Sequence, residues 1–354
     1  MRVRDGGCGV RDIRVVHWGL GAMGTGMAHL VQLKPRLRSV GATTFAPAHP
    51  GQDLGDALGL ERRLGVPIAP TFSEALPTDG ADVVLIATGS FAADQEQDIL
   101  DAITAGVNVI TIAEEMTYPW RRNPELAARL DSAARKHRVT VLGTGINPGF
   151  VLDTLIIALT GVCGQVDAVR ARRINDLSPF GPTVLRTQGV GTTPEEFQRG
   201  LEQGTIVGHV GFPESMAMIA AALGWTLDEI REERQPIISK TARSSPYTRI
   251  KPGQVAGCRH VARAYRGDKA LIELDHPQQI HPEAEGIETG DYVWIDGSPP
   301  ISLAIKPEIA GGAGTVAVAV NMIPAVVDAA PGLTDMSKLP IPRATMGDLR
   351  SVTR

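Results

Sequence analysis

A glycine-rich turn near the start of the chain joins a short β-branched run to a helical pattern. The run Ile13–Trp18 predicts a buried strand, and Met23–Leu33 predicts a helix. Between them lie Gly19, Leu20, Gly21, Ala22, Met23 and Gly24. In this G-x-G-x-x-G order the first glycine permits a tight turn, the second lets the backbone approach a pyrophosphate, and the third lets helix and strand pack closely. The turn predicts a Rossmann domain that holds a dinucleotide at a helix N-terminus.

Strand and helix patterns alternate along the first part of the chain, which predicts βαβ units around a parallel sheet. The expected strands are Ile13–Trp18, Ser39–Phe45, Val83–Thr88, Val107–Ala113 and Thr140–Gly143. The expected helices are Met23–Leu33, Ser73–Leu76, Ala93–Ala105 and Pro124–Lys136. The fold class is α/β, with a doubly wound parallel sheet.

The pattern changes at the Gly- and Pro-rich segment Gly143–Phe150, where we expect a domain boundary. The expected strands beyond it are Val166–Ile174, Ile237–Ser239, Val255–Ala264, Ala270–Asp275 and Tyr292–Ile295. The expected helices are Val151–Leu159, Pro194–Gln203, Glu214–Ala222 and Gly314–Val327. We therefore expect a loose tail at 1–12, a Rossmann domain at 13–147, an α+β domain at 148–313, and at 314–354 a helix and extended tail that return to the Rossmann domain.

The charge balance argues against a nucleic-acid partner. The net charge of the 354 residues is −4 at pH 7, so there is no basic surplus to neutralise a phosphate backbone. Three cysteines, Cys8, Cys163 and Cys258, lie far apart and favour a reducing, cytoplasmic compartment. The chain start shows no secretory signal, and the apolar stretch Thr315–Val327 is shorter than the roughly 20 residues of a membrane span, so we expect no membrane partner.

The end of the second expected strand bears on the choice of cofactor. Acidic residues at this place usually hydrogen-bond the adenosine ribose of NAD, but Thr43 and Thr44 stand here. The nearest cations are Arg36, Arg38 and His49, and none follows the strand at once. The sequence therefore predicts NAD or NADP without a strict preference. Residues expected on the nicotinamide side are Thr88, Gly89 and Ser90.

Two adjacent carboxylates, Glu114 and Glu115, follow another expected buried strand at the edge of the sheet where ligands bind. An ammonium group must lose a proton before its carbon can give up hydride, and a carboxylate with a raised pKa suits that task. Adjacent side chains at a strand end point to opposite sides, so at most one of the two is expected to face the nicotinamide. The alternative is that both begin a solvated loop.

Polar clusters in the second domain are candidates for substrate contacts. Arg173 and Asn175 share one face of an expected strand and could bind a carboxylate, although a surface strand edge explains them equally well. His209 lies in a second cluster, and His276 with Gln278 in a third. The spacing of the histidines at 260, 276 and 281 matches no closed zinc site, so we expect no metal. No motif for acyl or phosphoryl transfer is present.

Motifs along the whole chain resemble those of one family. These are WGLGAMG, TIAEEMTYPW, GTGINPGFVLDTL, RINDLSPFGPT, GHVGFPES, AGCRH, HPQQIHPE and NMIPAV, between about Ile13 and Arg343. In these motifs the chain resembles the 2,4-diaminopentanoate dehydrogenases and the native amine dehydrogenases related to them. The family is similar in fold to dihydrodipicolinate reductases and homoserine dehydrogenases, which implies a Rossmann domain, a dimerising substrate domain and a homodimer.

The resemblance implies reversible NAD(P)-dependent oxidative deamination of a small amine or diamino acid. The first candidate reaction converts 2,4-diaminopentanoate to 2-amino-4-oxopentanoate and ammonia. The family's essential glutamate falls in the AEEM motif, so it is Glu114 or Glu115, and the wider fold favours Glu114. The family's polar pocket residues correspond to Arg173, Asn175, His209, His276, Gln278 and Thr315. Gln278 and Thr315 would bond the polar end of the substrate or ordered water. Thr44 departs from the family, because many members carry an acid there.

Three other readings remain open. The enzyme could act as an amine dehydrogenase on simpler ketones or 4-oxo acids, which need fewer polar contacts. A non-catalytic protein could use the Rossmann domain to sense NAD(P). Alcohol oxidation of the homoserine dehydrogenase type is a third reading, but those relatives place a lysine where this chain has a carboxylate.

Overall fold

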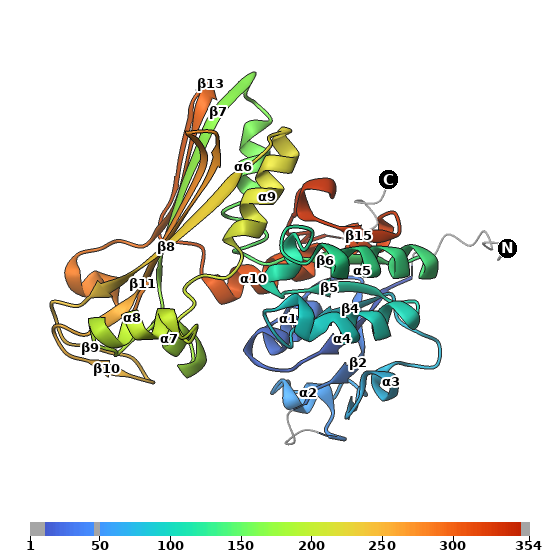
Figure 1. The fold of residues 1–354 in the computed structure, drawn as a ribbon. Helices are drawn as coiled ribbons and strands as arrows, with labels where there is room; N and C mark the ends of the chain where they lie inside the picture. Colours follow the sequence, from blue (N-terminus) through green and yellow to red (C-terminus); the bar gives the residue numbers. More distant parts are fainter. Residues whose placement is uncertain (1–10, 46–49, 348–354) are drawn as a thin grey trace. The chain divides into compact units, whose positions relative to one another are not determined.

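A computed structural model describes residues 11–45 and 50–347 of the chain (Figure 1). Nearly all of the expected N-terminal tail, Cys8 and His49 lie outside the described residues. The chain forms two compact units. The first contains the residues up to Met116, then Asn123–Gly145, then those from Thr315 onward. The second contains Thr117–Arg122 and Ile146–Gly314.

The first unit is built on a seven-stranded sheet in the order β15-β6-β5-β4-β1-β2-β3, in which all pairs are parallel. Its strands are β1 (Ile13–Trp18), β2 (Leu37–Thr43), β3 (Ile68–Ala69), β4 (Val83–Ile86), β5 (Asn108–Thr111), β6 (Thr140–Gly143) and β15 (Gly332–Thr334). The expected doubly wound parallel sheet is confirmed. Strand order reverses between β1 and β4, and ligands of such sheets bind beyond the carboxyl ends of the strands at that point.

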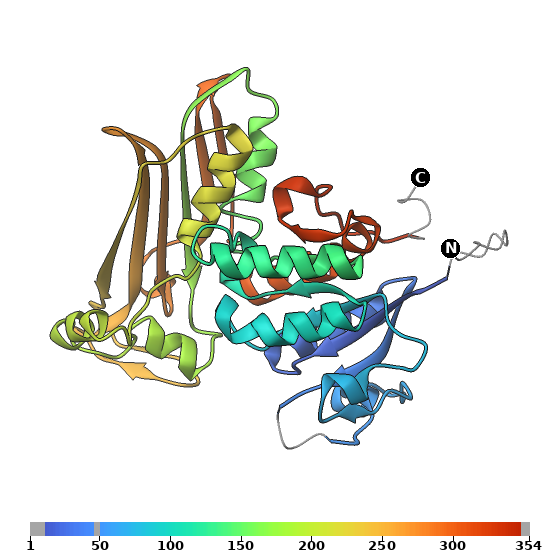
Figure 2. The ribbon, with the colours of Figure 1, turned by 45° about the vertical axis from the view of Figure 1, so that its right-hand side comes forward.

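Helices cover this sheet. They are α1 (Ala22–Leu33), α2 (Leu54–Ala57), α3 (Phe72–Ala75), α4 (Ala92–Thr104), α5 (Pro124–His137) and α11 (Ile323–Asp328), with 3-10 turns η1 (Glu114–Thr117) and η3 (Met336–Lys338). Helices α4 and α5 lie side by side (Figure 2), and α11 packs against β5 and β6. All four residues of β4 are buried, since both faces of a parallel sheet are covered.

The apolar stretch Gly311–Asp328 passes a length and composition test for a membrane span, with a mean hydropathy of 1.3 over 18 residues. It is longer than the stretch singled out in the sequence. It consists of α10 (Gly311–Asn321) and α11, which meet at Met322. The packing of α11 on β5 and β6 is that of a core helix, and core helices pass the same test.

The second unit is built on a six-stranded sheet in the order β14-β13-β7-β12-β11-β8. Its strands are β7 (Gln165–Asp176), β8 (Glu229–Ile238), β11 (Val255–Arg266), β12 (Lys269–Gln279), β13 (Gly290–Ser298) and β14 (Ile301–Ile305), and a separate small ribbon joins β9 (Arg243–Ser244) to β10 (Arg249–Ile250). Only the central pair, β7 with β12, is parallel. This mixed sheet with its helices confirms the expected α+β unit.

One face of this sheet carries the core of the second unit. The helices are α6 (Thr154–Thr160), α7 (Pro182–Thr187), α8 (Pro194–Glu202) and α9 (Phe212–Leu223), with the 3-10 turn η2 (Pro282–Glu285). Helices α6 and α9 pack together on the sheet through Ile156, Phe212 and Met216 (Figure 1). Within the described part of the chain no helix lies on the opposite face (Figure 2).

The largest error in the predicted strand bounds is at β8. We predicted only Ile237–Ser239, whereas the strand runs over Glu229–Ile238. Half of the residues in its sequence EIREERQPII are charged, because β8 is an edge strand and alternate side chains remain in solvent along it. The extended tail expected after Pro331 contains β15, which pairs with β6.

Candidate active site

The glycine turn between β1 and α1 has the geometry needed to hold a dinucleotide. Gly19 has φ +92°, a conformation that favours glycine. A Cβ on Gly24 would lie 1.8 Å from the carbonyl oxygen of Gly19, so only glycine fits there. A Cβ on Gly21 would meet nothing within 4 Å, which leaves space over the turn. Helix α1 has neither a side-chain cap nor an acidic residue in its first turn, so its N-terminus suits a phosphate.

The other predicted cofactor residues lie at the same edge of the sheet. Thr43 ends β2, and its carbonyl accepts a 2.9 Å hydrogen bond from Gly19 N. Buried Gln95 fixes the segment after β4, because its Nε2 donates to Thr88 Oγ1 and to the Gly89 carbonyl, both at 3.1 Å. Sequence reasoning missed Gln95, because its contacts with Thr88 and Gly89 are apparent only in the folded structure. Leu20, Ala22 and Met23 complete the turn, and Thr44 and Ser90 follow β2 and Gly89.

The two adjacent glutamates lie in η1, directly after β5, and have different surroundings. Glu115 Oε2 accepts hydrogen bonds from Ala92 N at 3.0 Å and Asn123 Nδ2 at 3.2 Å, so it fixes the start of α4. Burial raises the pKa of Glu114 to about 7, against the opposing effect of a hydrogen bond from Ser90. Glu114 can therefore exchange a proton near neutral pH, as a general base must.

Asn175 and His276 meet on adjacent strands of the second unit. His276 Nε2 lies 3.0 Å from Asn175 Oδ1, and His276 Nδ1 lies 3.2 Å from Asn147 Nδ2. An amide NH2 can only donate and an amide oxygen can only accept, so His276 carries its proton on Nε2. Sequence reasoning missed Asn147, because the GTGINPGF segment was interpreted only as a domain boundary.

His209 lies at the edge of this group. Its ring contacts that of His276 at 5.0 Å between centroids and that of Phe212 at 4.7 Å. Its backbone N–H donates to His260 Nδ1 at 3.1 Å, and His260 Nε2 lies 3.1 Å from Glu232 Oε2. Among the described residues no group hydrogen-bonds the buried Nε2 of His209. This atom is thus positioned to bond a ligand.

His209 and His276 are neutral at physiological pH. Burial lowers the pKa of His209 well below its ordinary value. The neighbouring His260 and Arg173 lower it further. Burial and the same kinds of neighbours lower the pKa of His276 similarly. Neutral imidazoles can donate and accept, so this group can bond an amine or a carbonyl oxygen without carrying charge.

Arg173 is held inside the protein rather than at a surface strand edge. Its Nη1 lies 2.5 Å from Asp291 Oδ1, and its Nη2 donates to the Ile309 carbonyl at 2.6 Å. Both side chains are almost wholly buried, at 2% and 1% exposure. Burial raises the pKa of Asp291 although Arg173 opposes this effect. Arg173 was predicted to bind a carboxylate of the substrate. In the structure it binds the carboxylate of Asp291 instead.

Replacing Arg173 by methionine is expected to lower the free energy of unfolding by about 3–5 kcal/mol, because Asp291 would be left buried and unpaired. Urea unfolding followed by tryptophan fluorescence measures this loss. The matched control is Arg170→Met on the same strand, where the pair with Asp296 is exposed and should contribute at most about 1 kcal/mol. Equal losses in the two variants would contradict the buried-pair interpretation.

Gln278 and Thr315 complete the predicted substrate residues. Gln278 lies opposite Asn175 in the β7–β12 register, and its Nε2 donates to Gln188 Oε1 at 3.4 Å. The structure therefore brings together Asn175, His276 and Gln278 on one face of the sheet. Thr315 lies on α10, at a point where the chain belongs to the first unit.

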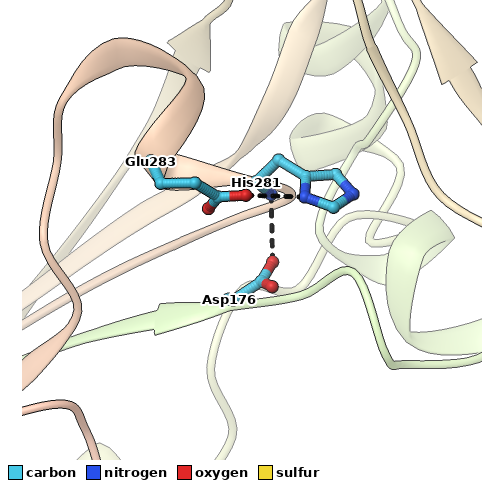
Figure 3. Close-up of side chains that lie close together, drawn as sticks. All are labelled: Asp176, His281 and Glu283. Carbon is cyan, nitrogen blue, oxygen red and sulfur yellow. Dashed lines mark hydrogen bonds and ion pairs between the residues drawn. The ribbon is translucent and has the colours of Figure 1, made fainter.

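One group of side chains has the composition of a metal site, although we expected none. Figure 3 shows Asp176, His281 and Glu283, whose potential ligand atoms lie within 4.8 Å of one another. His281 Nδ1 lies 2.8 Å from Glu283 Oε1, and Asp176 Oδ1 accepts from His281 N at 3.0 Å (Figure 3). These bonds fasten the end of β12 to the end of β7, so the grouping has a structural explanation.

Comparison with known proteins decides the family. The C-terminal domain of 2,4-diaminopentanoate dehydrogenase matches residues 150–354. The 2,4-diaminopentanoate dehydrogenase of Acetoanaerobium sticklandii is 45% identical over 346 residues, which cover 97% of this chain and 98% of that protein. The chain belongs to the 2,4-diaminopentanoate dehydrogenase family. The expected family resemblance is confirmed, and the chain is an NAD(P)-dependent oxidoreductase that acts on a CH–NH2 group.

Amine dehydrogenases also match over nearly the whole chain. That of Streptomyces virginiae is 27% identical, with 95% of this chain and 98% of that protein covered. The solved amine dehydrogenase of Mycobacterium smegmatis is 30% identical, with a TM-score of 0.84 and coverage of 95% and 98%. Relatives of the chain thus carry both names.

Proposed function

We propose that the chain oxidatively deaminates 2,4-diaminopentanoate to 2-amino-4-oxopentanoate and ammonia, and catalyses the reverse reductive amination. The substrate is inferred from the Acetoanaerobium relative, which matches from end to end at 45% identity. The observation that carries the mechanism is the placement of Glu114 at the carboxyl end of β5 with a pKa near 7.

We propose that Glu114 is the general base. It removes a proton from the substrate ammonium, so that the nitrogen lone pair can form a C=N bond as hydride leaves the carbon. The bound dinucleotide supplies the hydride acceptor at nicotinamide C4. Water then adds to the imine, and the products are the ketone and ammonia. In the reverse direction protonated Glu114 returns the proton.

We propose that the polar residues of the second unit bind the substrate. Neutral His209 offers Nε2 to a polar atom of the ligand, and Gln278 binds the polar end or ordered water. Thr315 is proposed to bond the polar end of the substrate or ordered water as well. Asn175 and His276 are joined by a hydrogen bond, and the ring of His276 contacts that of His209. Arg173 acts as a positioning residue, since its guanidinium bonds Asp291 and Ile309.

Two alternatives are tested by the same assay. An amine dehydrogenase for simpler ketones or 4-oxo acids is favoured by the amine dehydrogenase relatives. Initial rates in ammonium buffer, with NADH and NADPH, compare 2-amino-4-oxopentanoate with 4-oxopentanoate and a simple ketone. We expect kcat/KM to be about tenfold to hundredfold higher for 2-amino-4-oxopentanoate, because one hydrogen bond to a charged group contributes about this factor. Cofactor binding without any turnover would instead favour a sensing protein.

We propose a homodimer formed through the open face of the six-stranded sheet. On this face Arg172 and Arg259 both pair with Asp275, at 3.3 and 2.9 Å, and the rings of Tyr292 and Trp294 stack in parallel. Mixed charge around aromatic rings suits an interface with a second copy. A cytoplasmic location is likewise a proposal, supported by the free thiols of Cys163 and Cys258.

Trp294→Arg is expected to convert the dimer to a monomer, because it places a charge within the proposed interface. Light scattering after gel filtration measures the mass. The control is Val162→Arg, which changes an exposed apolar residue outside the sheet and should leave the mass unchanged. A wild-type monomer, or a Trp294→Arg dimer, would refute this interface.

A further inference from the structure

A cavity of about 650 Å³ lies in the first unit at the carboxyl ends of β1 and β2. Trp18 and Thr43, the last residues of the two strands, line it. Trp18 directly precedes the glycine turn, so the cavity adjoins the place where the pyrophosphate is expected. A dinucleotide seated on that turn extends in two directions, and the side of β2 receives adenosine.

The walls of the cavity suit a nucleoside. Phe45, at its mouth, is 71% exposed, and a base can stack on such a ring. The rings of Trp18 and Phe72 stack at 4.6 Å with an interplanar angle of 7°, which makes a rigid wall. An exposed aromatic ring beside a rigid apolar wall is a good match for adenine.

The charge in this cavity is negative. Asp98 and Asp101 line it from α4, and their spacing of three puts both on one face of the helix. Within residues 11–45 and 50–347, each accepts a hydrogen bond from an uncharged group only: Thr88 Oγ1 at 3.4 Å for Asp98, and Gln97 Nε2 at 2.7 Å for Asp101. None of the described residues that line the cavity is basic.

The cations near β2 in sequence lie at the wrong end of the strand. Arg36 precedes β2 and pairs with Asp12, and Arg38 is its second residue. Arg38 is five residues from Thr43, or about 16 Å at roughly 3.3 Å per residue. Neither guanidinium can neutralise a phosphate at the end where adenosine is expected.

We propose that Asp98 and Asp101 make the enzyme select NAD over NADP. This inference rests on the cofactor site described above and goes beyond the expectation of an undecided preference. The 2′-phosphate that distinguishes NADP carries a charge of about −1.5 to −2 at pH 7, as a phosphomonoester does. Two carboxylates in a partly enclosed cavity repel that charge, whereas the ribose hydroxyl of NAD is neutral. Helix α4 thus supplies the acidic selectivity that β2 supplies in other Rossmann domains.

Dissociation constants of NADH and NADPH, measured by calorimetry on the full chain, test this proposal without any turnover. We expect the wild type to bind NADH at least about tenfold more tightly. Asp98→Asn with Asp101→Asn should move the ratio of the two constants about tenfold toward NADPH, through tighter NADPH binding. The matched control is Asp94→Asn, which removes a charge from α4 away from the cavity and should leave the ratio unchanged.

A salt series on the wild type provides a second measurement that needs no variant. The preference for NADH should shrink as salt rises from about 0.05 to 0.5 M, because the repulsion is screened. Equal affinities in the wild type, a ratio unmoved by the double substitution, or a ratio independent of salt would overturn the proposal. Failure of both dinucleotides to bind would instead overturn the proposed function.

Discussion

Glu114→Gln is expected to lower the turnover number by about two to four orders of magnitude, the range that a positioned general base contributes. Glutamine keeps the size of the side chain but cannot take a proton from the substrate nitrogen. NADH affinity should remain within about twofold, because the glycine turn is untouched. Steady-state kinetics and calorimetry on the same preparation measure both quantities.

The adjacent Glu115→Gln is the matched control. Glu115 holds Ala92 and Asn123, so this variant should lose stability of about 1–3 kcal/mol while keeping most of its turnover. The pH profile gives an independent check. Oxidative deamination in the wild type should fall as the pH drops below about 7, because Glu114 becomes protonated. If Glu115→Gln removed turnover and Glu114→Gln did not, the roles would have to be exchanged.

Gly24→Ala is expected to abolish NADH binding. The added Cβ would lie 1.8 Å from the Gly19 carbonyl oxygen, which forces the turn out of its binding conformation. The midpoint of thermal unfolding should also fall, since β1 and α1 separate. Calorimetry with NADH and differential scanning calorimetry record the two effects.

Gly21→Ala separates binding from folding. A Cβ at this position meets no protein atom within 4 Å, so the unfolding midpoint should stay close to that of the wild type. The same methyl group would crowd a pyrophosphate and weaken NADH binding about tenfold to hundredfold. Unchanged affinity in Gly21→Ala would mean that the dinucleotide does not lie over this turn.

The first unit could be predicted from the sequence to a large extent because its signals are local. Strands β1 and β6 have the predicted bounds, since each is a compact apolar run between turn residues. The short strands β3 and β15 were missed because two or three residues are too few to show an alternating apolar pattern. Most of edge strand β8 was missed because its charged residues carry little apolar signal.

The side-chain roles depended on contacts that no local pattern contains. Asp291, the partner of Arg173, is 118 positions away in the sequence. Glu114 and Glu115 look equivalent in sequence, and only their three-dimensional surroundings distinguish a desolvated carboxyl group from a helix-capping one. The acidic face of α4 reads as an ordinary solvated helix surface until the cavity beside it is known.

The placement of β15 has a consequence for biosynthesis. This strand closes the edge of the first unit's sheet beside β6, and the Thr140 hydroxyl donates to the Ala330 carbonyl, 190 positions later. A ribosome must therefore release the chain as far as Thr334 before the sheet that contains β1 can acquire β15. The second unit, nearly all of which is the continuous stretch 146–314, can reach its native state earlier. The second unit can thus complete its fold before the first unit, although translation of the first unit begins earlier.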